Sequence, residues 1–371
     1  MAKAWPIRCC IDGVLAGTGP TLFVSTQNMS FKSLLQSMYL RGYFAVRRVL
    51  GLSLFEKCKF LKAHRRWPPS APAQTFTESI LARKLGAADE RFPVLADKVA
   101  VRSWVAQRIG PQHLIPALAV YDYDNLESID VAPGQVIKCA NRAGGVYFTS
   151  TEDLTSRAAF IKKIRKDLDF DFAAWTGENW YSRIPKRVIA EQALTGPDGG
   201  VPADYKFFVF NGVVKTIQLH MGRFAAHTLV IFDRDWQQLP LSMAKYGVPD
   251  ELPARPAGLD RMLEIAEILG KDFDFIRVDL YETDDHAIYF GEMTIAPGSG
   301  LTRFQPVYYD WLLGQWWQQA ASARQSSPAL PSPGVITPAG SSPAGAVASK
   351  WPDATAEERD AKPHPRRSAN A

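Results

Sequence analysis

Two acidic side chains in the last third of the chain have the types and spacing to hold a divalent cation. Residues 275–300 contain two runs of alternating apolar and polar residues around a polar turn, which is the pattern of a β-hairpin. If Tyr281 pairs with Phe290, Asp279 stands opposite Glu292, and opposed residues on one sheet face have Cβ atoms about 5 Å apart. Two carboxylates that close repel each other unless a cation lies between them, and a hard ion such as Mg²⁺ suits that gap.

The same hairpin adds a cationic side chain to this face. Arg277 lies two residues before Asp279 on the first strand, where a guanidinium could hold an anion next to the metal. The second strand is expected to present one set of side chains together: Ile288, Phe290, Glu292 and Thr294. The alternative is a surface hairpin whose carboxylates are solvated, and this stretch alone does not decide between the two.

A second set of candidate residues lies in the middle of the chain. Lys138 is on a short predicted strand, directly before a glycine turn that contains Gly144 and Gly145. The lysine ammonium and the backbone N–H groups of such a turn can cradle phosphates. A plain hairpin with an exposed lysine is the alternative, because short motifs of this kind often arise by chance.

Further along, residues 187–194 are predicted to form a strand that runs into a linker. Backbone N–H and C=O groups of Gln192 to Leu194 could hold an adenine ring there, and Glu191 could accept hydrogen bonds from ribose hydroxyls. A buried strand with a capping acid is the alternative. The next hairpin, residues 204–217, turns at an Asn-Gly pair and carries Lys206 on its first strand.

Helices are expected to position these strands. Thr75 and Glu78 have the spacing of a capping box at the start of a short helix. Asp97 is expected to cap a helix that Gly110 ends, with an apolar stripe at helical spacing between them. Two further amphipathic helices are predicted, over residues 150–170 and 259–269.

The composition fits a globular protein with a full core. The chain has 371 residues, of which 46% are hydrophobic and 22% charged, enough for two domains or one large α/β domain. Its four cysteines lack metal-ligand spacing and make no disulfide framework, which favours a reduced, cytoplasmic setting. No run of about 18 apolar residues is present, so no transmembrane helix is expected.

The chain is expected to divide into four regions. These are an irregular N-terminal extension over 1–30, a basic helical region over 31–95, a main domain over 96–320 and a disordered Ala/Ser/Pro-rich tail over 321–371. The tail has too little apolar surface to offset the entropy lost on ordering.

The basic region concentrates positive charge. Residues 31–66 hold nine Lys and Arg residues against Glu56 alone, so their net charge is 9 − 1 = +8. A basic amphipathic helix of this kind can lie on an anionic membrane surface. A helix that packs on the core with a solvated basic face is the alternative. Nucleic acid is a third option, but no recognisable nucleic-acid-binding motif accompanies the charge, so none is expected as a partner.

Taken in order, these motifs resemble the ATP-grasp superfamily, and most closely its TupA-like branch, which is named for teichuronopeptide biosynthesis and occurs among capsule and surface-polysaccharide genes. The resemblance extends from near Leu40 to near Gln318. The phrases that carry it are TFTE (75–78), DKVAVR (97–102), LIP (114–116), DYKFF (204–208), FDFIRVDLY (273–281) and FGEMT (290–294).

The resemblance implies an α+β fold in which two α+β subdomains grip ATP between antiparallel sheets, with residues 96–320 as the ATP-grasp domain. It implies that Lys138 and Lys206 hold the phosphates and that the loop at Gly144 and Gly145 closes over them. Glu191 and the backbone of residues 192–194 would hold the ribose and the adenine.

The resemblance also implies a Mg²⁺ site at Asp279 and Glu292. Thr294 stands where most ATP-grasp enzymes carry an asparagine ligand, and a threonine hydroxyl is a weaker metal ligand. The turn over residues 140–145 departs from the His- and Ser-bearing version that is associated with the branch, so loop closure or substrate choice would differ.

The implied reaction is ATP- and Mg²⁺-dependent amide formation. A carboxylate attacks the γ-phosphorus to give an acylphosphate, and an amine then displaces phosphate, with Arg277 stabilising the charged intermediate. The expected substrates are the carboxylate and the amine of a cell-surface polysaccharide or teichuronopeptide-like polymer, handled in the cytoplasm at the inner face of the membrane.

Two alternatives stay open. A polysaccharide-pathway glycosyltransferase would use an Asp-x-Asp run after a strand, which residues 122–124 and 233–235 both provide. A non-catalytic nucleotide-binding scaffold is the other, because the hydroxyl of Thr294 is a weak metal ligand.

Overall fold

The computed structural model describes residues 31–70, 72–149, 156–196, 199–222, 227–243, 247–249 and 251–326. The predicted extension over 1–30 and the predicted tail from 327 onward lie outside these residues. The described residues fall within one compact unit, Met1–Ser327. The domain boundary expected between residues 95 and 96 stays a prediction.

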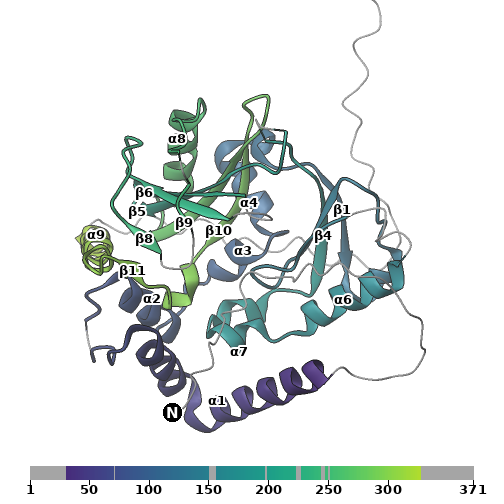
Figure 1. The fold of residues 1–371 in the computed structure, drawn as a ribbon, viewed down its shortest axis with the longest axis horizontal. Helices are drawn as coiled ribbons and strands as arrows, with labels where there is room; N and C mark the ends of the chain where they lie inside the picture. Colours follow the sequence, from purple (N-terminus) through teal and green to yellow (C-terminus); the bar gives the residue numbers. More distant parts are fainter. Residues whose placement is uncertain are drawn as a thin grey trace, which may run out of the picture. The chain divides into compact units, whose positions relative to one another are not determined.

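A four-stranded antiparallel sheet forms the smaller of the two main sheets. Its strand order is β1-β4-β2-β3, from β1 (Ala117–Asp122), β4 (Arg187–Gln192), β2 (Gln135–Cys139) and β3 (Val146–Phe148). Helix α6 (Arg157–Asp169) runs beside this sheet (Figure 1) and shares a hydrophobic core with it. The predicted helix over 150–170 is thus confirmed from Arg157 onward, and residues 150–155 lie outside the described chain.

A five-stranded antiparallel sheet is the larger of the two main sheets. Its order is β10-β9-β5-β6-β7, from β10 (Ile288–Thr294), β9 (Phe275–Glu282), β5 (Asp204–Phe210), β6 (Val213–Met221) and β7 (Thr228–Phe232). The predicted Asn-Gly turn joins β5 to β6. Asn211 and Gly212 have φ values of 47° and 78°, as a type I′ turn requires.

Helices pack against this larger sheet. Helix α8 (Leu259–Gly270) buries Met262, Leu263, Ala266 and Leu269, as its apolar spacing predicts. The sheet's remaining neighbours are α2 (Phe76–Leu85), α3 (Phe92–Ala96), α9 (Tyr308–Ser326) and the two-stranded sheet of β8 (Ser242–Met243) with β11 (Phe304–Gln305). Helix α4 (Val101–Ile109) packs on α8 and α3.

The predicted boundaries of α2 and the predicted end of α4 are confirmed, whereas α4 begins only at Val101, with Ala100 as its N-cap. Thr75 and Glu78 form the capping box of α2, in which each side chain accepts from the other's backbone N–H. Gly110 ends α4. Asp97 caps the turn that leads into α4, since its Oδ1 accepts from the backbone N of Val99 at 2.8 Å.

Among the described residues there are also short segments, namely α7 (Phe172–Thr176) and the 3-10 helices η1 (Pro111–His113), η2 (Tyr123–Ser128), η3 (Asn179–Arg183) and η4 (Pro297–Gly300). The basic region forms α1 (Phe31–His64), which confirms its predicted helical character. Gly51 breaks this helix into two halves, with φ 71° and ψ 167°. Two antiparallel sheets with packed helices confirm the α+β prediction.

Candidate functional site

The hairpin of β9 and β10 brings the two predicted acids together. Asp279 pairs with Glu292 across the hairpin, and Arg277 pairs with Thr294. The predicted pairing of Asp279 with Glu292 is therefore confirmed. Paired residues project from the same face of a sheet, so all four of these side chains belong to one face.

The register that led to this expectation is wrong. Tyr281 pairs with Tyr289, and Phe290 pairs with Leu280. A β-bulge between Phe290 and Glu292 adds one residue, Gly291, and restores the pairing of the acids. A side chain at Gly291 would not fit, because its Cβ would lie 2.8 Å from the Tyr281 ring.

The bulge also corrects the predicted face of β10. Phe290 and Ile288 pair with the core-facing residues of β9, whereas Glu292 and Thr294 pair on the other face. The four side chains that were expected to lie together are therefore divided in two pairs. A simple two-residue alternation cannot describe a strand that contains an extra residue.

The cation between the two acids is the guanidinium of Arg277. Its Nε lies 2.6 Å from Asp279 Oδ1, and its Nη2 lies 2.7 Å from both Asp279 Oδ2 and Glu292 Oε1. Burial alone would lower the pKa of Arg277, but Asp279 and Glu292 together raise it, so the guanidinium stays charged.

Lys206 on the neighbouring strand β5 extends the cluster. Its Nζ lies 2.5 Å from Asp204 Oδ2 and 2.5 Å from Asp279 Oδ2. Burial raises the pKa of Asp279 above its ordinary value, and the cations Arg277 and Lys206 oppose that shift. Three carboxylates and two cations are thus gathered on adjacent strands of one sheet.

The donor types of this cluster fit a Mg²⁺ ion. Asp279 and Glu292 offer carboxylate oxygens, which are the ligands that Mg²⁺ prefers. The Thr294 hydroxyl donates to Glu292 Oε1 at 3.0 Å, so its oxygen retains lone pairs. Arg277 fills the space between the two acids, however, so a metal ion there requires the guanidinium to move aside. Among the residues that the structure describes, no group of three or more His, Cys, Asp and Glu side chains is arranged to hold a metal.

The predicted phosphate and ribose residues meet on the smaller sheet. Lys138 Nζ on β2 lies 2.6 Å from Glu191 Oε2 on the adjacent strand β4. Arg102 of α4 reaches the same carboxylate, with its Nη1 2.8 Å from Glu191 Oε1. Glu191 is 5% exposed, so two cations balance a carboxylate that burial would otherwise disfavour.

The glycine turn after β2 is held by side chains from two other elements. Gly144 and Gly145 have φ values of 74° and 60°, which a glycine adopts without strain. Lys98 Nζ donates to the Arg142 carbonyl at 2.5 Å, and Arg142 Nη1 pairs with Asp167 at 2.7 Å. Burial lowers the pKa of Lys98, and the nearby Glu292 opposes that shift.

Lys98 therefore interacts with candidate site residues of both sheets. It holds the turn that follows Lys138, and the charge of Glu292 on β10 acts on it.

The linker after β4 uses two of its backbone N–H groups locally. Gln192 N donates to Pro116 O at 3.1 Å, and Ala193 N donates to Gly134 O at 3.0 Å. Leu194 is partly exposed. The adenine-binding role of residues 192–194 stays a prediction, and it depends on the carbonyl groups or on a local opening.

Spacing arguments missed three charged residues of these clusters, Lys98, Arg102 and Asp204. Lys98 and Arg102 lie in the phrase DKVAVR, where the apolar spacing predicts a helix but does not indicate partners for the charged residues. Asp204 opens the strand that carries Lys206, and the two-residue period places both on one face.

The two Asp-x-Asp runs lie at turns. Residues 122–124 join β1 to η2, and Asp122 and Asp124 are exposed. The Asp233 Oδ1 accepts from the backbone N of Asp235 at 2.9 Å and of Gln237 at 2.8 Å, so this carboxylate caps its own turn.

Comparison with known proteins gives a match to one protein family. A family model described as TupA-like ATPgrasp matches residues 78–318. No protein of the curated set matches the chain significantly.

Solved structures with similar folds include three synthetases. The D-alanine–D-alanine ligase from Bacillus anthracis complexed with ATP is 14% identical, with a TM-score of 0.33 over 63% of this chain and 68% of that one. The L-amino acid ligase from Bacillus licheniformis is 17% identical, with a TM-score of 0.36 over 61% of this chain and 50% of that one.

The N5-carboxyaminoimidazole synthetase from Staphylococcus aureus is 12% identical, with a TM-score of 0.31 over 54% of this chain. The match spans 44% of that synthetase, less than half of its length.

Proposed function

The chain belongs to the TupA-like ATP-grasp family, and from this membership we propose that it is an ATP- and Mg²⁺-dependent ligase that joins a carboxylate to an amine. The observation that carries the proposal is the cluster on β9, β10 and β5. It unites Arg277, Asp279 and Glu292 with Lys206 within hydrogen-bond distances. Such a set can bind a polyphosphate together with its cation.

In the proposed reaction, the substrate carboxylate attacks the γ-phosphorus and ADP leaves. The amine then attacks the acyl carbon, phosphate leaves with the bonding electron pair, and the amine loses a proton. Mg²⁺, when bound at Asp279 and Glu292, neutralises charge on the phosphate oxygens. Thr294 is the proposed third ligand.

The cationic side chains have separate proposed roles. Lys206 and Lys138 attract phosphate oxygens from the larger and the smaller sheet, and each is held by a carboxylate partner, Asp279 or Glu191. When Arg277 moves away from Glu292, its planar guanidinium can stabilise the oxyanion of the tetrahedral intermediate. Gly144 and Gly145 allow the turn after Lys138 to cover the phosphates.

For the substrates, we propose a carboxylate of a surface-polysaccharide precursor, such as a uronic acid, and the amine of an amino acid. The TupA-like family is named for teichuronopeptide synthesis, and this is the support for the substrate class. The nucleotide would lie between the two sheets, with Glu191 and residues 192–194 at its ribose and adenine. Such an enzyme would work in the cytoplasm, at the inner face of the membrane, which the basic region could contact.

The proposal is tested by ADP formation. Purified protein with ATP and Mg²⁺ is screened against pairs of uronic acids and amino acids, and ADP release that requires both substrates is the expected result. A melting temperature that rises with ATP and Mg²⁺ separates this function from a glycosyltransferase. A rise with UDP-sugars but not with ATP would overturn the proposal.

A nucleotide-binding scaffold gives a different outcome. ATP would raise the melting temperature, but no pair of substrates would release ADP. The Asp279→Asn variant adds a control, because it should abolish any Mg²⁺-dependent ADP release that belongs to this site.

A further inference from the structure

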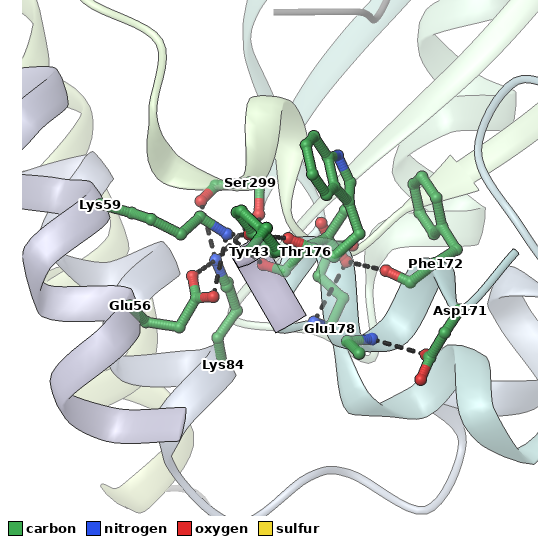
Figure 2. A network of polar contacts seen from close by, with 11 residues as sticks. Tyr43, Glu56, Lys59, Lys84, Asp171, Phe172, Thr176, Glu178 and Ser299 are labelled. Carbon is green, nitrogen blue, oxygen red and sulfur yellow. Dashed lines mark hydrogen bonds and ion pairs between the residues drawn. The ribbon is translucent and has the colours of Figure 1, made fainter. Parts of the chain in front are cut away.

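The second half of α1 is fixed to the body by a buried polar network (Figure 2), which we call the Glu56 network and which consists of Glu56, Lys59, Lys84, Glu178 and Ser299. Glu56 is fully buried and pairs with Lys84 of α2 at 2.6 Å and with Lys59 at 2.9 Å. Lys84 Nζ also donates to the Ser299 hydroxyl of η4 at 2.8 Å. This part of α1 is therefore an integral element of the fold.

The first half of α1 lies against α7 along one side. The Tyr43 hydroxyl donates to Trp175 O at 2.7 Å, and the two rings have centroids 4.4 Å apart. Phe44, one position along, has its ring 6.4 Å from that of Phe170. These contacts set the rotation of the helix about its axis, so its opposite side faces outward.

The outward side is apolar. We define the outer face of α1 as Leu35, Met38, Ala45, Val46 and Val49, which fall on one side at helical spacing. The side chains of Leu35, Met38, Val46 and Val49 are 48%, 60%, 50% and 84% exposed. Within the described part of the chain, nothing covers this face. A helix with its apolar residues on the solvent side is unusual for a surface helix, whose apolar stripe normally faces the core.

Positive charge borders this face, and the same stretch of helix carries no acid. Arg41 and Arg48 are both exposed and lie along one edge of the outer face. Residues 31–55 contain four basic residues and no Asp or Glu, for a net charge of +4. No described helix is long and apolar enough to cross a bilayer.

We propose that the outer face of α1 docks on an anionic phospholipid surface. Val49, Met38 and their neighbours would enter the boundary between headgroups and acyl chains, and Arg41 and Arg48 would extend toward the lipid phosphates. The inference deepens the proposed membrane location, but the surface is built without any residue of the ATP site.

Charge favours an anionic membrane over two other occupants of this face, a second copy of the chain and residues 1–30. A second copy of the chain would bring the +4 segment against another +4 segment, which is repulsive. Residues 1–30 hold Lys3 and Arg8 against Asp12, so that segment cannot supply the missing negative charge either. An anionic membrane supplies both the apolar layer and the opposite charge.

The test is sedimentation of the full chain with phospholipid vesicles. We expect binding to vesicles that contain phosphatidylglycerol, much weaker binding to pure phosphatidylcholine, and a loss of binding as salt increases. Val49→Glu should lower the partition coefficient at least about tenfold, since it places a charge at the apolar boundary. Val248→Glu is the matched control, because Val248 is 59% exposed and lies outside α1.

A second variant tests the charges. Arg41→Gln combined with Arg48→Gln should lower binding by about 30-fold, since each basic residue near an anionic surface contributes a several-fold factor. The proposal is overturned if Val49→Glu binds as well as Val248→Glu. Equal binding to neutral and anionic vesicles would also overturn it, as would a Val49-dependent dimer in sedimentation velocity. ADP release measured without vesicles reports on the ligase proposal separately.

Discussion

Replacing Lys84 with methionine should destabilise the protein strongly. Lys84 is buried, and its ammonium contacts Glu56 at 2.6 Å and the Ser299 hydroxyl at 2.8 Å. Methionine fills most of the volume but removes the charge, so Glu56 keeps only Lys59 as a cationic partner. Breaking a buried ion pair on one side costs about 3–5 kcal/mol, and the retained Lys59 places the expected loss at about 3 kcal/mol.

The measurement is urea unfolding followed by the fluorescence of the protein's ten tryptophans. Lys62→Met is the control, since Lys62 lies on α1, the helix that carries Glu56, and is exposed. We expect it to change the free energy of unfolding by less than about 0.5 kcal/mol. If Lys84→Met costs no more than this control, the ion pair does not hold α1 to α2 as argued.

A double variant separates the ion pair from side-chain packing. Glu56→Gln together with Lys84→Met removes both charges, so no uncompensated carboxylate remains buried. The double variant should lose less stability than the sum of the two single variants. A strictly additive loss would contradict an electrostatic role for the pair.

Three further predictions concern the site and the network. Asp279→Asn should lower Mg²⁺-dependent ADP release by about 100-fold or more, as a lost charge-stabilising group does; unchanged turnover would refute its assignment. Gly145→Ala should lower the melting temperature more than Gly144→Ala. Both glycines have a positive φ, so both substitutions strain the backbone. Only at residue 145 would the added Cβ also lie 3.0 Å from the Cys139 side chain. Burial raises the pKa of Glu178 from 4.5 to about 7. As pH rises, Glu178 therefore loses its proton in the unfolded chain before it does so in the folded protein. The free energy of unfolding should fall as pH rises from about 4.5 to 7. Glu178→Gln should flatten that dependence in unfolding experiments, and an unchanged slope would contradict it.

Local patterns predicted the elements of the fold well. The capping box at Thr75, the Asn-Gly turn at Asn211 and the stripe of α8 each depend on residues a few positions apart. Such patterns are decided by backbone geometry and by burial of one face, and both can be recognised in the chain itself.

Long-range partners were harder to predict. The acids of β9 and β10 were paired correctly, but Arg277 as the cation between them was not foreseen, nor was Lys98 beside the turn after β2. A charge finds its partner through the tertiary fold, and residues 98 and 142 are far apart in the chain. The basic character of α1 was evident, but its spacing alone did not tell which side of the helix would face outward.

The bulge at Gly291 makes strand length as important as residue type in this hairpin. If Gly291 were instead paired with Asp279 in a regular ladder, Glu292 would stand opposite Val278 and face the hydrophobic core. Removal of Gly291 would join Phe290 directly to Glu292 and leave the two acids opposite each other in a regular strand. When homologous chains are aligned, a gap at this position would therefore be compatible with the same pair of acids.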